Sequence, residues 1–300
     1  MDYIRLLNAV ESVVRGKRDI AEYLLATLLA GGHALLEDIP GVGKTLLALS
    51  LSKVLGLSFR RFQFTSDTLP SDILGSFVFD TKKGDFVFRP GPIFTNVFLA
   101  DEINRASPKT QSALLEAMAE GQVTVEGETF KLPEPFFVIA TQNPLEEWGT
   151  FPLPHSELDR FMVKTSVGYP PPDIEREILA GENPYRKVEN LQPLADRNTI
   201  LAERERVRNV KLKGDALDFA YRVVEATRKH PDVLIGVSTR GAIHWISFGK
   251  ALSHMRELPF LPKEILKECA VKVLAHRLVL KESSLKGEEE IIEEILREVS

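Results

Sequence analysis

The residues with the clearest chemical potential form a glycine-bearing segment near the N-terminus. Residues 37–45 read Glu-Asp-Ile-Pro-Gly-Val-Gly-Lys-Thr, follow an apolar run and open onto a helical pattern. A strand, a turn with glycines and a helix N-terminus together make a phosphate-binding loop, because glycine lets backbone N–H groups point inward without an obstructing Cβ. The sequence therefore predicts that phosphates of a nucleotide bind at Asp38, Pro40, Gly41, Val42, Gly43, Lys44, Thr45 and Leu46.

Two side chains of this phosphate loop have specific roles in the prediction. Lys44 can reach the outer phosphates as a point charge, and the Thr45 hydroxyl can bind Mg²⁺. Asp38 departs from the usual pattern, which has glycine at this position, and we expect it to adopt the turn geometry that glycine would supply. For Gly-Lys-Thr taken alone, the alternative is a surface turn before an ordinary helix.

Two adjacent carboxylates end a second apolar run. Residues 96–102 read Asn-Val-Phe-Leu-Ala-Asp-Glu, which predicts a buried strand beside the phosphate loop in a parallel sheet. In such a site Asp101 would hold Mg²⁺, and Glu102 would polarise the water that attacks the γ-phosphate. The pattern is weak alone and gains weight from its position after the phosphate loop. Kinase chemistry would need an acceptor site, for which we find no sequence signature.

Other residues could complete a nucleotide site. Asn143 follows a third apolar run, residues 136–140, and could orient the attacking water from the side opposite Glu102. As a lone Asn before Pro, it has the alternative of being a turn residue. Val13, Val14 and Gly16, at the end of the first predicted helical segment and in the break after it, could lie against an adenine ring or simply pack as helix residues.

The elements that must position these residues form an α/β pattern followed by a helical one. Two β-hairpins are predicted, over residues 77–88 and 122–131. Three prolines at 170–172 mark a boundary, because proline cannot continue a strand or a helix interior. We predict an α/β domain over residues 1–169, with a parallel sheet flanked by helices and the two hairpins as insertions, and a smaller all-helical domain over 170–300.

Composition argues against several classes of protein. The 300 residues are 44% hydrophobic and can bury a sizeable core, and the net charge of −5 argues against an overall nucleic-acid-binding surface. The sequence has no run of 18 apolar residues and no signal-peptide layout at its N-terminus, so we expect no membrane span and a cytoplasmic location. The single cysteine, Cys269, cannot form an internal disulfide and lies in a helical pattern as a core residue.

Several motifs, in order along the chain, resemble those of the MoxR family of AAA+ ATPases. They are the phosphate loop and residues 97–107, 140–144, 149–154, 158–161, 237–241 and 276–278. The resemblance implies an α/β nucleotide-binding domain with a helical lid, and ATP hydrolysis to ADP with Mg²⁺ between subunits of a ring, usually a hexamer. It also implies chaperone-like maturation of partner proteins, which often carry von Willebrand factor A domains. The two hairpins resemble insertions that mark this branch of AAA+ proteins.

The resemblance also assigns roles to two arginines. Arg160, in Leu-Asp-Arg-Phe, looks like an arginine finger that reaches the γ-phosphate of a neighbouring subunit, where a fixed planar cation stabilises transition-state charge. Its alternative is a surface arginine paired with Asp159. Arg240 resembles the second sensor, which couples the lid position to the γ-phosphate, and its alternative is an ordinary exposed arginine at a helix start.

Three further matches complete the catalytic set that the resemblance implies. Asp101 and Glu102 match the metal-binding and catalytic carboxylates, and Asn143 matches the first sensor. Gln63 stands where related ATPases keep a polar residue that restrains the catalytic glutamate. Residues 155–157 read His-Ser-Glu where the family often has Glu-Ala-Gln, a departure near the implied subunit interface.

Two rival functions from other classes stay open. A nucleotide-gated binding module would switch partners by its bound nucleotide and show little turnover, so steady-state hydrolysis distinguishes it. A DNA-remodelling ring, related to helicases that share the insertion, is disfavoured by the acidic chain and would be supported by salt-dependent DNA affinity.

Overall fold

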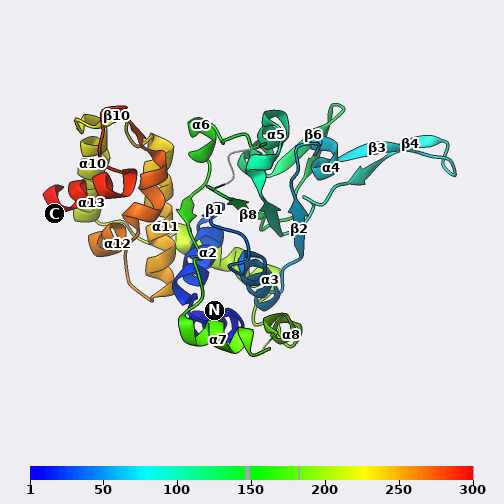
Figure 1. Cartoon of the computed structure of the whole chain (residues 1–300), viewed down its shortest axis with the longest axis horizontal. Coiled ribbons are helices and arrows are strands. Elements are labelled where there is room, and N and C mark those ends of the chain that lie inside the picture. The colour runs from blue at the N-terminus through cyan, green and yellow to red at the C-terminus, as the bar shows by residue number, and fades with distance from the viewer. Residues whose placement is uncertain (146–148, 182, 300) are drawn as a thin grey trace. The chain divides into compact units, whose positions relative to one another are not determined.

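The computed structural model describes residues 1–145, 149–181 and 183–299, and the chain divides into two compact units (Figure 1). Unit 1 comprises Met1–Ala21, Leu35–Leu153 and Ser166–Leu201. Unit 2 comprises Glu22–Ala34, Pro154–Thr165 and Ala202–Ser300. Each unit has its own set of buried apolar side chains.

The predicted sheet is present and positions the chemistry. Over the described ranges it has five strands in the order β2-β5-β8-β1-β9, which are Phe59–Gln63, Val97–Asp101, Phe137–Gln142, Ala34–Glu37 and Val163–Thr165. β2 pairs with β5, and β5 with β8, in parallel. Because parallel strands end at the same edge of a sheet, the residues that follow them gather there. The register places Gln63 opposite Asp101 at that edge.

The strands differ in sequence because they differ in position. A central parallel strand is covered on both faces, so it is a continuous apolar run rather than an alternating one. Every residue of β5 is buried, as this rule requires. β2 lies at the edge of the sheet and accordingly exposes Arg60, Arg61 and Gln63.

Helices complete unit 1. They are α1 (Tyr3–Glu11), α3 (Lys44–Val54), α4 (Pro70–Leu74), α5 (Pro108–Glu120), α7 (Pro172–Leu179), α8 (Pro184–Glu189) and the 3₁₀ turn η1 (Ile103–Arg105), while α2 (Arg18–Ala30) and α9 (Arg197–Arg208) contribute to both units. The limits of α5 follow its sequence signals. Ser107 is its N-cap, proline occupies the first turn, and Gly121 ends it with a φ of 64°.

Both predicted hairpins are present in unit 1. β3 (Gly75–Asp80) pairs with β4 (Asp85–Pro90), and β6 (Gln122–Val125) pairs with β7 (Glu128–Lys131). The rings of Phe88 and Phe130 stack with centroids 3.9 Å apart, so the two hairpins pack on each other near their bases. Figure 1 shows the β3–β4 hairpin extending away from the rest of unit 1, and Phe79 and Phe86 are exposed along it.

Unit 2 is mainly helical. Its elements are α6 (His155–Leu158), the strand β9, α10 (Gly214–Lys229), α11 (Thr239–Met255), α12 (Lys263–Leu274), the 3₁₀ turn η2 (Ala275–Arg277), α13 (Glu288–Val299) and the short antiparallel pair β10 (Val233–Ile235) and β11 (Val279–Leu280). Trp245 is fully buried and donates its indole N–H to the Leu266 carbonyl at 2.9 Å. Cys269 is buried beside it, and burial raises the pKa of its thiol, which fits a core residue.

The helices that follow the proline segment pack with unit 1. Lys53 on α3 donates to the carbonyls of Val188 and Glu189, at 2.7 and 2.6 Å, and Arg15 forms an ion pair with Glu177 on α7. The compact units thus group residues 166–201 with the sheet, whereas the sequence places a domain boundary at 170. Prolines end one element and begin another, but they do not determine which body the next helix packs on. As a boundary between functional domains, residue 170 stays a prediction.

None of the helices within the described ranges is long and apolar enough to cross a membrane.

Candidate functional site

A cavity of about 340 Å³ lies in unit 1 where the phosphate loop meets the ends of β2 and β5. The loop residues Pro40 to Leu46 line one side of it, and Asp101 and Glu102 line another. The structure therefore brings together the predicted phosphate-binding residues and the predicted carboxylate pair. Apolar side chains from other segments line it too, among them Val13, Val14, Pro170 and Ile174.

The phosphate loop has the geometry of an anion site. Gly41 and Gly43 have φ values of 86° and 95°, which non-glycine residues rarely adopt, and Gly43 caps α3 without a side chain. The first N–H groups of α3 thus meet the cavity without a capping side chain, and a helix N-terminus favours negative charge. Lys44 places its ammonium over the loop, where it donates to the carbonyls of Asp38 at 3.0 Å and Ile39 at 3.2 Å.

A threonine that sequence reasoning missed holds the carboxylate pair in place. The Thr141 hydroxyl donates to Oδ1 of Asp101 at 2.6 Å and accepts the Glu102 N–H at 2.9 Å. Glu102 has a φ of 58° and a ψ of 50°, in the left-handed region that a non-glycine residue occupies only when its surroundings enforce it. The only signal for Thr141 was its position at the end of β8, beside the end of β5.

The side chain of Glu102 is held by hydrogen bonds. Its Oε2 accepts from Nε2 of Gln63 at 2.6 Å and forms an ion pair with Arg105 at 3.3 Å. The sequence predicted a polar restraint of Glu102 at Gln63, and the structure contains that contact.

The donor set of the cavity fits a magnesium ion. Thr45 and Asp101 line the same cavity, and hydroxyl and carboxylate oxygens are ligands that Mg²⁺ prefers. Oδ2 of Asp101 already faces a cation, because the Arg61 guanidinium donates to it at 2.7 and 3.0 Å. Thr45 and Asp101 are thus the residues of this chain that would hold Mg²⁺.

Asp38 does not replace glycine in the expected way. It is buried, and its φ is not positive. It is also not among the residues that line the cavity over the described ranges. Instead its carboxylate accepts the backbone N–H groups of Val167 and Gly168. Lys17 donates to the carbonyl of the next residue, Tyr169, at 2.6 Å, so the entry of the phosphate loop is tied to the segment before α7.

We expect Asp38→Ala to lower the free energy of unfolding by about 1–3 kcal/mol, because the buried N–H of Val167 and the partly buried N–H of Gly168 lose their acceptor. Asp38→Asn should lose less, since its amide oxygen can still accept one of the two bonds. Urea unfolding of the three proteins at neutral pH provides the measurement. Equal stability of Asp38→Ala and the unmodified protein would show that this contact does not stabilise the fold.

Asn143 is buried but does not line the cavity in the described part of the chain. Its Oδ1 accepts the N–H of Leu145 at 3.1 Å, as in a turn stabilised by an asparagine side chain. This geometry matches the alternative given above, and the role of Asn143 as a sensor stays a prediction.

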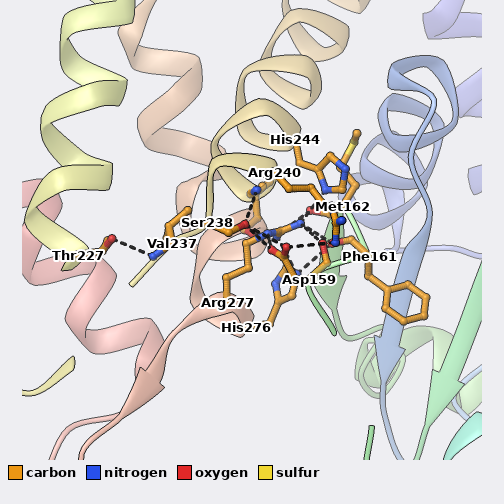
Figure 2. Close-up of polar contacts among 12 residues, drawn as sticks. Asp159, Phe161, Met162, Thr227, Val237, Ser238, Arg240, His244, His276 and Arg277 are labelled. Carbon is orange, nitrogen blue, oxygen red and sulfur yellow. Dashed lines mark hydrogen bonds and ion pairs between the residues drawn. The ribbon is translucent and has the colours of Figure 1, made fainter. Parts of the chain in front are cut away.

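Arg160 and Arg240, the two arginines with predicted roles, both belong to unit 2. Figure 2 shows Asp159, which precedes Arg160, at the centre of a polar cluster. Asp159 forms ion pairs with Arg277 at 3.0 Å and Arg240 at 3.6 Å and accepts the Ser238 hydroxyl at 3.0 Å. The ion pairs of Asp159 described here are with Arg240 and Arg277, and the alternative of a pair between Arg160 and Asp159 stays a prediction. The cluster joins the segment that carries Arg160 to the start of α11, where Arg240 lies.

Arg277 is the buried cation that pairs with Asp159 in that cluster. Its guanidinium donates to the carbonyl of Phe161 at 2.6 Å and to ring nitrogens of His244 and His276, each at 2.8 Å. Burial lowers the pKa of Arg277 to about 10, and Asp159 opposes that shift. A Cβ on Gly241 would lie 2.4 Å from Cδ of Arg277, which explains the glycine in the Val-Ser-Thr-Arg-Gly motif.

Acid should destabilise this cluster. Burial and the charge of Arg277 lower the pKa of His244 to about 3, so the folded state keeps the ring neutral while the unfolded chain binds a proton below about pH 6.5. The contribution of His244 to the free energy of unfolding is therefore fully present above about pH 6.5. It is lost as the pH drops towards 3, at up to about 1.4 kcal/mol per pH unit. Urea unfolding at pH 7.5 and 5.5 should show a smaller acid-induced loss for His244→Asn. An equal acid-induced loss of stability in His244→Asn and in the unmodified protein would contradict the role given to His244.

Comparisons with known proteins find the same two parts, an AAA domain and a lid domain. The family model described as "ATPase family associated with various cellular activities (AAA)" matches residues 33–163, and an AAA lid domain model matches residues 225–297. YeaC of Bacillus subtilis is 44% identical over 98% of this chain and 93% of its own length. Chaperone MoxR1 of Mycobacterium tuberculosis is 38% identical over 99% of this chain and 81% of its own length.

A solved structure has the same fold. The crystal structure of a Cytophaga hutchinsonii protein superposes with a TM-score of 0.89 at 35% identity, covering 100% of this chain and 96% of that one. The parallel sheet, the helical lid and the phosphate loop beside paired carboxylates agree with these matches. The chain belongs to the MoxR family of AAA+ ATPases.

Proposed function

We propose that this protein is a Mg²⁺-dependent ATP hydrolase that works as a ring, usually a hexamer in this family, and uses hydrolysis to remodel partner proteins. The observation that carries the proposal is the meeting of the phosphate loop, Asp101 and Glu102 at one cavity. An anion site beside a metal-binding carboxylate and a second carboxylate is what γ-phosphate hydrolysis requires.

Each residue of the cavity has a distinct task in this proposal. The N–H groups at the start of α3 and the Lys44 ammonium bind the outer phosphates, while Thr45 and Asp101 hold the metal. Mg²⁺, when bound, neutralises charge on the phosphate oxygens. Glu102 orients the attacking water and accepts its proton, which requires that its carboxylate leave Gln63. The apolar wall with Val13 and Val14 suits the adenine ring.

The proposal also assigns roles to Arg160 and Arg240, which both belong to unit 2. Arg160 acts as a finger on the nucleotide of the neighbouring subunit, and Arg240 senses the nucleotide of its own subunit. The cluster around Asp159 supports this, because it fixes the chain next to Arg160 to the helix that carries Arg240. A rigid support limits the motion of a catalytic arginine and so lowers the entropic cost of placing it.

The partner is tested by capture in a defined nucleotide state. With Mg-ATP, the Glu102→Gln variant should hold ATP without hydrolysing it and retain partners that release only after hydrolysis. Lys44→Ala, which should not bind ATP, is the matched control. We expect proteins that are enriched on Glu102→Gln and absent on Lys44→Ala, including ones with von Willebrand factor A domains. Capture of the same proteins by both variants would contradict the proposal that remodelling of cytoplasmic partners is coupled to the bound nucleotide.

Two other functions remain as test outcomes. Turnover that stays below one ATP per subunit over hours, with and without partner, would favour a nucleotide-gated binding module. DNA affinity at physiological salt that falls steeply as salt rises would favour a DNA-remodelling ring. The net charge of −5 weighs against the second.

A further inference from the structure

We propose that Arg61 takes the place of Mg²⁺ at Asp101 when no metal is bound and, through Gln63, holds Glu102 in its inactive position. Arg61 would then be a positioning residue that couples arrival of the metal to release of the catalytic carboxylate. This inference rests on the proposed function and deepens it, because it concerns regulation of the same site.

A continuous chain of hydrogen bonds connects the two carboxylates. Nε and Nη2 of Arg61 donate to Oδ2 of Asp101 at 3.0 and 2.7 Å, and Nη2 also donates to Oε1 of Gln63 at 2.9 Å. Nε2 of Gln63 in turn donates to Oε2 of Glu102 at 2.6 Å. One guanidinium therefore touches the predicted metal ligand and the residue that restrains the predicted catalytic base.

The strand geometry explains how this chain arises. Arg61 and Gln63 are two residues apart on β2, so their side chains project from the same face of the sheet. The parallel register sets Gln63 opposite Asp101, which brings both side chains to the end of β5. Arg60, which directly precedes Arg61, projects from the opposite face.

Arg61 and a metal ion compete for the same oxygen. Oδ1 of Asp101 already accepts the Thr141 hydroxyl at 2.6 Å, which leaves Oδ2 as the oxygen that faces a cation. A guanidinium on that oxygen repels a second cation, because like charges a few ångströms apart disfavour each other. The Arg61 side chain is 48% exposed on an edge strand, so it has room to swing away when the metal binds.

Departure of Arg61 loosens the restraint on Glu102. Gln63 is oriented by the hydrogen bond that its Oε1 accepts from Arg61, and this orientation points its Nε2 at Glu102. Without Arg61 the amide is free to rotate, so Glu102 loses the 2.6 Å hydrogen bond from Gln63 and keeps the longer ion pair with Arg105 at 3.3 Å. Nucleotide bound without metal would thus leave Glu102 restrained, and the catalytic base would become available only once the metal is in place.

The test measures metal dependence of nucleotide binding, not hydrolysis. Fluorescent ADP is titrated with Mg²⁺ on the full-length protein, and the Mg²⁺ concentration for the half-maximal effect is compared between unmodified protein, Arg61→Ala and Arg61→Gln. Arg60→Ala is the matched control, because it removes an arginine from the other face of the same strand. We expect a fall of about three- to tenfold in that Mg²⁺ concentration for both Arg61 variants, and none for Arg60→Ala.

Gln63→Ala separates the two halves of the inference. It should leave the Mg²⁺ midpoint unchanged, since Arg61 still faces Asp101, while it raises basal ATP hydrolysis because Glu102 loses the shorter of the two contacts described for its Oε2. Thermal unfolding of each variant checks that it is folded, and Arg61→Gln preserves most of the side-chain volume should Arg61→Ala fold poorly.

The outcomes distinguish this inference from the function on which it rests. Mg²⁺-dependent nucleotide binding with an unchanged or raised midpoint in folded Arg61 variants overturns the inference and leaves the proposed function standing. Absence of nucleotide binding by the unmodified protein, with or without Mg²⁺, overturns both. A lowered midpoint in Arg60→Ala as well would show a general charge effect and would also overturn the role of Arg61.

Discussion

Glu102→Gln is expected to lower ATP hydrolysis by about two orders of magnitude or more and to leave ATP affinity nearly unchanged. Gln has the size of Glu and keeps a hydrogen-bonding oxygen near the cavity, but it cannot accept a proton from the attacking water. Steady-state phosphate release gives the rate, and equilibrium binding of fluorescent ATP gives the affinity.

Lys44→Ala is the control for this result, because it should weaken ATP binding itself. Its ammonium lies over the phosphate loop and would face the outer phosphates. Hydrolysis is then lost in both variants for different reasons. Equal loss of ATP binding in Glu102→Gln and Lys44→Ala would contradict the catalytic role assigned to Glu102.

Arg160→Ala is expected to bind ATP almost normally and to hydrolyse it on the order of 10³ times more slowly, because a cation that stabilises the transition state is lost. If Arg160 acts on a neighbouring subunit, the activity of the unmodified protein should rise more steeply than in proportion to its concentration over the range in which it assembles. Size-exclusion chromatography with light scattering, run alongside the phosphate assay, defines that range.

A mixing experiment sharpens the test of Arg160. Arg160→Ala subunits keep an intact phosphate loop, and Lys44→Ala subunits keep an intact arginine. Some interfaces of a mixed ring therefore contain both functional parts, and activity should partly reappear after subunit exchange. Hydrolysis by assembled Arg160→Ala at the unmodified rate would show that Arg160 is not a finger.

Much of the fold was predictable because its signals are local. The buried strand β5 is a continuous apolar run, the ends of α5 are a serine–proline start and a glycine stop, and the turn between β6 and β7 has Glu126 and Gly127 with positive φ. Paired carboxylates directly after a buried strand placed Asp101 and Glu102 correctly at the cavity, because strand polarity determines which end faces the site.

The contacts that were not predicted join residues far apart in sequence. Thr141 and Arg61 each bond to Asp101 across a neighbouring strand, and no local pattern gives the register that brings them together. Asp38 resembles a simple replacement of glycine until its carboxylate is seen to accept N–H groups about 130 residues away. Arg277 lies in a recognised motif, but its burial against Asp159 depends on the packing of the helices in unit 2.

Phosphate release by the unmodified protein tests the central claim most directly. At a concentration where the protein is assembled, with Mg²⁺ and ATP, it should complete many turnovers per subunit, and removal of Mg²⁺ with a chelator should stop them. Glu102→Gln from the same preparation sets the background. A rate for the unmodified protein that does not exceed this background, with or without a captured partner, would contradict the claim that the cavity beside the phosphate loop hydrolyses ATP.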